Sequence, residues 1–162
     1  HQPNQKQTKT IMTSIAIRMG SSKSKHNGEF ADEYMKEKIK QTMSIGIHFN
    51  VLIDLSDSEV FETELSHNPH MTTRIQTMIR TFRNLKEGDI LYAIYKKNLI
   101  YYKLRVTRPY YFDNNVIWNW PTSSGGFFHR VGIEILEDYS KNPIVKSKNF
   151  SISTVSHTTI NI

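Results

Sequence analysis

The chain has 162 residues, of which 38% are apolar, and it contains no cysteine. The missing cysteines exclude disulfide bonds and thiolate zinc sites, and no run of uncharged apolar residues is long enough to span a membrane. The formal net charge of +6 at pH 7 favours a polyanionic partner, because cationic side chains gain affinity by releasing counterions from phosphates.

The expected organisation is a single domain behind a polar leader. Residues 1–11 are polar and show no periodicity, so we expect them to be weakly ordered. Residues 12–162 are enough for one domain with its own apolar core. No apolar signal segment follows the polar start, and cysteine is absent, so we expect an intracellular protein.

Short strands are expected near the start of the chain. The pattern predicts a first strand over Ser14 to Met19, which a polar, glycine-containing loop ends. A second short strand is expected over Ser44 to Phe49. Between them, Glu29 to Gln41 form either a helix or a covering loop.

Two helices are expected next. Ser56 precedes an acidic turn, Asp57 to Glu59, which favours a helix start and predicts a short helix to about Leu65. We expect Pro69 to begin a second helix. Its apolar residues recur at three- and four-residue steps, as one stripe: Met71, Ile75, Met78, Ile79 and Phe82.

The second half predicts strands and an aromatic loop. A hairpin is expected from Ile90 to Tyr95 and from Leu99 to Thr107, followed by an aromatic-rich loop and a strand over Arg130 to Leu136. We expect the tail, Phe150 to Ile162, to cap or complete the fold. Alternation in the second hairpin strand places one set of side chains towards the core: Ile100, Tyr102, Leu104 and Val106. It places another set on the opposite face: Tyr101, Lys103 and Arg105.

These elements predict an α+β fold. Short strands with strong turns and two clear helices favour a small curved, barrel-like β-sheet with helices packed outside it. The chain shows no repeated parallel strand–helix–strand pattern and no internal repeat.

Several short motifs, in this order, resemble a known family. They are Ile17-Arg18-Met19-Gly20, Phe30, Ser44-Ile45-Gly46-Ile47, Asp54-Leu55-Ser56, Phe82 with Lys86-Glu87-Gly88-Asp89-Ile90, and His129-Arg130-Val131 with Glu134. The order is similar to that of PUA-like domains of the EVE and YTH kind, above all those fused to methylation-dependent restriction enzymes. The resemblance implies a small curved β-barrel flanked by helices, which binds modified bases or RNA.

A modified-base reader needs aromatic walls, because a methyl group on a flat base gains contact mainly with ring faces. The candidate pocket residues are Trp118, Trp120, Tyr110, Tyr111, Phe112, Phe49 and Tyr92, with Asp54 or Asn50 at the base edge. The candidate phosphate-binding residues are Arg18, Lys23, Lys25, Lys103, Arg105, Arg108 and Arg130. Either tryptophan is alternatively a core residue, the rings at 110–112 cannot all face inward, and Arg18 and Arg130 equally suit structural ion pairs.

Catalysis and cofactor binding are not indicated. Glu137 to Lys141 come nearest to a nuclease pattern, but a solvated turn explains them better. His67 and His70 lack a third ligand for a metal, and no phosphate loop or nucleophile motif is present. Since the resemblance implies binding of modified bases, the expected function is a non-catalytic targeting module that reads a flipped, methylated base.

Several questions of partner stay open from the sequence. DNA is the favoured ligand, RNA is the alternative, and a fused or separate nuclease or NTPase would supply the catalysis. A further alternative is a protein-interaction module that uses the tyrosine-rich hairpin as its contact surface.

Overall fold

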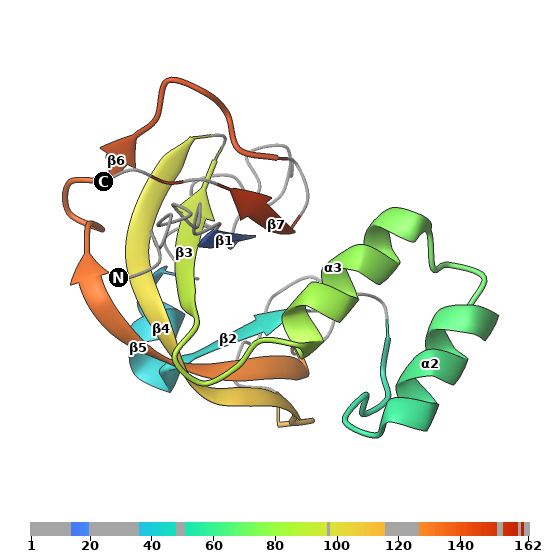
Figure 1. Ribbon diagram of the computed structural model, residues 1–162. Helices are drawn as coiled ribbons and strands as arrows, with labels where there is room; N and C mark the ends of the chain where they lie inside the picture. The colour runs from blue at the N-terminus through green and yellow to red at the C-terminus, as the bar shows by residue number, and fades with distance from the viewer. Residues whose placement is uncertain are drawn as a thin grey trace, which may run out of the picture.

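The computed structural model describes residues 14–19, 36–47, 51–96, 98–115, 127–151, 154–158 and 160. Within them the chain folds as an α+β domain, in which a curled mixed sheet of seven strands carries helices on its outside (Figure 1). The expected fold class is therefore confirmed. Six predicted site residues lie outside the described residues: Lys23, Lys25, Phe49, Asn50, Trp118 and Trp120.

The strand order is β2-β5-β4-β3-β1-β7, and β6 pairs with β4 beside this path. The bounds are β1 Ser14–Arg18, β2 Ser44–Ile47, β3 Ile90–Tyr95, β4 Leu99–Phe112, β5 His129–Asp138, β6 Ile144–Val145 and β7 Val155–Thr158. β1 runs parallel to β3, whereas the other described pairings are antiparallel. The curvature is greatest in the long strands β4 and β5 (Figure 1).

The predicted strands of the first half are confirmed, and the tail contributes a strand of its own. β1 ends at Arg18, close to the expected Met19, and β2 begins at Ser44 as expected. The tail completes the sheet rather than only capping it, because β7 pairs antiparallel with β1. Residues 36–42 are helical, and the side chain of Ile39 is fully buried, which favours the helix over the covering loop for this part of Glu29 to Gln41. Residues 29–35 of that segment lie outside the described residues.

Helix α2, Ser58–His67, begins one residue later than the sequence suggested. Its N-cap is Asp57, whose carboxylate accepts hydrogen bonds from the backbone N–H groups of Glu59 and Val60 at 2.9 and 3.0 Å. An acidic cap satisfies otherwise orphaned N–H groups and suits the positive end of the helix.

Helix α3, Thr73–Arg83, begins at the N-cap Thr72, so the predicted start at Pro69 is wrong. Asn68 explains the difference. Its backbone N–H still bonds into α2, and its side-chain oxygen accepts a hydrogen bond from the N–H of His70 at 2.9 Å. Pro69 therefore lies within this local turn, and the next helix starts only after the turn ends.

Helix α3 joins two apolar clusters. Met78 and Phe82 are buried in the main core against the sheet, whereas Ile79 packs with Phe61 and Leu65 of α2. The expected apolar stripe is confirmed, and α2 is held to the sheet through α3. Both helices lie on one side of the curved sheet (Figure 1).

A β-bulge at Tyr101 breaks the alternation that was expected in β4. Ile100 pairs with Ile94, but Tyr102 pairs with Ala93, so Tyr101 is an extra residue. Ile100 consequently packs in an outer cluster, and the main core receives both tyrosines instead. The prediction that Ile100 shares the face of Tyr102 is wrong for this reason.

β4 also continues through the segment that was expected to be an aromatic loop. It ends only at Phe112, and the pairing with β5 shifts register between Arg108 and Tyr111. Pro109 falls inside this irregularity, where a missing N–H costs no ladder hydrogen bond. The shift therefore lets the strand pass a proline.

No helix among the described residues is long and apolar enough to cross a membrane.

Candidate nucleic-acid interface

Three strands meet at one end of the sheet, which we call the β2/β4/β5 end. The last residue of β2, Ile47, pairs with His129, and so does the last residue of β4, Phe112. Phe49 follows β2 in the chain, and Trp118 and Trp120 follow β4, so the segments that carry them start from neighbouring strand ends. The three rings themselves lie outside the described residues, and their role stays a prediction.

His129 is fully buried at this end and bonded at both ring nitrogens. Its Nε2 lies 2.7 Å from the carbonyl oxygen of Val51, and its Nδ1 lies 2.6 Å from the hydroxyl of Tyr110. A carbonyl can only accept, so Nε2 carries the proton and donates to Val51. In the neutral ring, Nδ1 then accepts from Tyr110. The same hydroxyl oxygen accepts from the N–H of Leu55 at 3.1 Å.

Tyr110 is a packing residue as well as a hydrogen-bonding one. Its ring stacks on His129 with centroids 5.8 Å apart and meets Phe82 edge-on at 6.4 Å. Burial raises the pKa of Tyr110 to about 12, and the nearby Asp54 carboxylate adds to the rise. The ring was expected to line the base pocket, but the fold already uses its hydroxyl and its contacts. It therefore supports the end of the sheet from inside.

Arg130 is also buried, with none of its surface exposed. Its Nη1 lies 3.0 Å from the Asp113 carboxylate, its Nε donates to the carbonyl of Phe127 at 3.1 Å, and its Nη2 donates to that of Asn115. Burial lowers the pKa of Arg130, and Asp113 opposes the change. Of the two roles left open by the sequence, the structural ion pair is the one present. Arg130 ties the end of β4 to the start of β5.

Arg108 and Tyr111 form the solvent-facing part of this end. The guanidinium carbon of Arg108 lies 3.7 Å from the centre of the Tyr111 ring, which is a close cation–π stack. Arg108 is exposed and Tyr111 is half-buried. A flat cation on a flat ring offers a base a stacking face and a phosphate a charged partner at the same place.

Asp54 lies close to this end on an exposed segment. Its carboxylate accepts from the N–H of Ser56 at 2.9 Å and from the Ser56 hydroxyl at 2.5 Å. The neighbouring Leu55 is held on both sides, since its N–H donates to Tyr110 and its carbonyl accepts from Arg83 at 2.7 Å. Asp54 thus precedes a residue that is held to Tyr110, and its role at a base edge stays a prediction.

Tyr92 does not belong to this end. Its side chain is 5% exposed and packs in the outer cluster with Ile94 and Ile100. It pairs with Lys103 of β4, and burial raises the pKa of Tyr92. Lys103 precedes Tyr110 by seven residues on β4, which is roughly 20 Å of strand. One base cannot contact both tyrosines. The structure therefore separates Tyr92 from the other predicted pocket residues.

The remaining predicted cations have varied surroundings. Arg105 forms an ion pair with Glu134 at 2.7 Å in which both side chains are nearly half exposed, so the pair is weak and the guanidinium stays accessible. Lys103 is half-buried opposite Glu137. Arg18 donates to the carbonyls of Phe150 and Ser151 at 3.4 and 2.7 Å, which holds the segment before β7.

The tyrosines of the hairpin do not form a surface. Tyr92, Tyr95, Tyr101 and Tyr102 are at most 7% exposed, and Tyr95 stacks on Tyr101 with centroids 4.3 Å apart. The predicted alternative of a protein contact made by this hairpin is therefore wrong for these rings. Among the described residues, no three histidine, aspartate or glutamate side chains gather where they could hold a metal ion.

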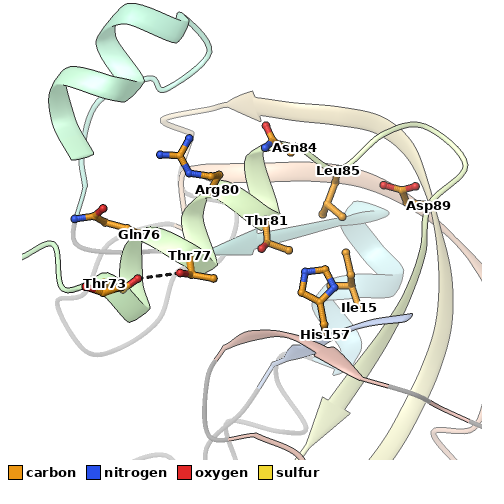
Figure 2. Close-up of a pocket in the computed structure, with 10 residues that line it drawn as sticks. All are labelled: Ile15, Thr73, Gln76, Thr77, Arg80, Thr81, Asn84, Leu85, Asp89 and His157. Atoms are coloured by element: carbon orange, nitrogen blue, oxygen red, sulfur yellow. Dashed lines mark hydrogen bonds between the residues drawn. The ribbon is translucent and has the colours of Figure 1, made fainter. Parts of the chain in front are cut away.

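The structure also contains a cleft that the sequence did not predict. Helix α3, the turn after it, β1 and β7 enclose a cleft of about 450 Å³, with Thr73, Thr77, Arg80, Asn84, Asp89 and His157 among its lining residues (Figure 2). Thr73, Thr77 and Thr81 recur at four-residue steps, a pattern that indicates a polar helix face. The position of β7 against α3 could not be read from local pattern.

Comparison with protein-family models and with curated proteins finds no match to this sequence.

Proposed function

We propose that this chain is a non-catalytic nucleic-acid-binding domain of the PUA-like kind. It accommodates a flipped, methylated base at the β2/β4/β5 end and acts inside the cell as the targeting module of a restriction-type protein. A fused or separate nuclease or NTPase supplies the chemistry. DNA is the favoured ligand, and RNA is the alternative that the experiment below separates.

One observation carries the proposal. The curled sheet brings the ends of β2 and β4 and the start of β5 together, and an exposed arginine on an aromatic ring stands at that place. A base reader needs stacking surface, positive charge and an edge partner within the size of one nucleotide. Tyr111 is the described residue with the stacking surface and Arg108 the one with the positive charge, and the edge partner assigned here is the predicted Asp54.

The interior of this end suits the same role. A pocket for a flipped base must keep its shape when empty, because ordering it on binding would reduce affinity. His129, Tyr110 and Arg130 are held by hydrogen bonds or ion pairs to five separate backbone or side-chain partners: Val51, Leu55, Phe127, Asn115 and Asp113. The support behind the Arg108–Tyr111 stack is therefore fixed in advance.

The test is a fluorescence-anisotropy titration with single-stranded and duplex 20-nucleotide probes of DNA and of RNA. Tyr111→Ala removes the ring and should weaken binding roughly tenfold, since stacking on an aromatic side chain contributes about 1–3 kcal/mol per base. Arg108→Ala should weaken binding and reduce its salt dependence.

Lys141→Ala is the matched control, because Lys141 is an exposed cation on the turn after β5. It should change affinity little. Equal losses in Lys141→Ala and Arg108→Ala would mean that only overall charge matters, and unchanged binding by Tyr111→Ala would remove the stacking role from this end.

A further inference from the structure

Two more clefts adjoin the α3–β7 cleft of Figure 2, and together they surround β7 and the start of β1. The first, of about 340 Å³, shares Ile15 and Asp89 with it and ends at Lys103 of β4. The second, of about 350 Å³, shares His157 with it and carries Lys146 and Lys148. We call the three adjoining clefts the β7 groove.

The lining chemistry of the β7 groove favours an anionic chain. Lysines stand at both ends, and hydroxyl and amide groups of α3 stand between them, such as Thr77, Thr81 and Asn84. Asp89 is the acidic residue among the lining residues, and its carboxylate already accepts from the N–H of Lys86 at 2.8 Å. Cations flanking neutral hydrogen-bonding groups match the phosphates and sugars of a nucleic-acid strand.

A line of cations connects this groove to the β2/β4/β5 end. Lys103, which lines the groove, is followed on β4 by the exposed Arg105 and Arg108. From Lys103 to Arg108 is five residues of strand, or roughly 16 Å. That length is several nucleotides of backbone, so one strand can contact both places.

We propose that the β7 groove binds the sugar–phosphate backbone of a single-stranded nucleic acid that runs along β4 from the β2/β4/β5 end. This rests on the proposed function and extends it: the base is read at one end, and the flanking strand is held by a groove that uses none of the predicted pocket residues except Tyr92.

The experiment compares a 6-nucleotide and a 20-nucleotide single-stranded DNA of related sequence over a series of salt concentrations. The double variant Lys146→Gln/Lys148→Gln, in the cleft farthest from the β2/β4/β5 end, should weaken binding of the long probe about tenfold at low salt. Its log–log salt slope should become shallower by about 1.4, since each single-strand phosphate contact contributes about 0.7. The short probe, held at the β2/β4/β5 end, should bind as it does to the unaltered protein.

Lys141→Gln is the control for lost charge, and urea midpoints check that each variant is folded. Equal losses for both probes, the same loss in Lys141→Gln, or no loss would overturn the groove. If Tyr111→Ala still weakens binding in that case, the proposed function stands without it. If the unaltered protein binds neither probe, both proposals fail together.

Discussion

Two arginines of the predicted phosphate-binding set show how differently one residue type is used. Arg130 is fully buried and faces Asp113 at 3.0 Å, whereas Arg105 meets Glu134 at 2.7 Å with both side chains open to water. The Arg105–Glu134 pair has the shorter distance but contributes less, because solvent screens the attraction between exposed charges. The buried Arg130 has no water to solvate it, so losing its charged partner would be costly.

Replacing Arg130 should therefore cost far more stability than replacing Arg105. We expect Arg130→Gln to lower the free energy of unfolding by about 3 kcal/mol, since it leaves the Asp113 carboxylate and two carbonyls without their donor. Arg105→Gln, the matched control, should cost less than about 1 kcal/mol. Urea denaturation measures both. Similar midpoints for the two variants would contradict the structural role of Arg130.

The close pairing of β4 with β5 depends on one glycine. A Cβ atom on Gly132 would lie 2.8 Å from the Cβ of Arg108 and 3.1 Å from the hydroxyl of Thr107. The register of the two strands shifts on both sides of Arg108. The absence of a side chain at Gly132 thus lets β4 approach closely where it presents Arg108 to solvent.

We expect Gly132→Ala to destabilise the protein by about 1–3 kcal/mol, as overpacking does in a tight contact. Arg108→Gly removes the opposing Cβ. In the double variant, much of the cost of the alanine should therefore disappear, which a double-mutant cycle of urea midpoints measures. Strictly additive effects would show that the contact with Arg108 is not the cause.

The elements that the sequence predicted well are those with a regular period. The apolar stripe of α3 and the alternation of Val131 and Ile133 in β5 depend only on local spacing. The bulge at Tyr101 and the passage of β4 beyond Pro109 depend on pairing with other strands. The local sequence pattern contains no information on the bulge or on the continuation of β4, and a proline by itself predicts the end of a strand.

The candidate site was predictable in part for the same reason. The aromatic and cationic residues near Arg108 and Tyr111 predicted a binding site in this part of the sequence. In the structure the two side chains stack on one another. The inward role of Tyr110 needs its partners His129 and Leu55, which come from distant parts of the chain. The α3–β7 cleft likewise forms only when the tail strand joins β1.

The whole molecule combines a rigid curved sheet with a basic outer line. The main core and the buried groups at the β2/β4/β5 end fix the sheet, while the helices α2 and α3 close one side of it (Figure 1). Lys103, Arg105 and Arg108 follow one another along the outside of β4. The proposed nucleic-acid ligand depends on this arrangement and on the net charge of +6.

The most direct test of base reading is a fluorescence-anisotropy titration of the unaltered protein and of Trp118→Ala and Trp120→Ala. The probes are matched DNA and RNA oligonucleotides, unmodified or carrying methylated cytosine or methylated adenine, at low and moderate salt. We predict at least about tenfold preference for one methylated probe, equal to roughly 1.4 kcal/mol. The preference should be lost in a tryptophan variant, and all binding should weaken as salt rises. No binding to any probe at low salt would contradict the account.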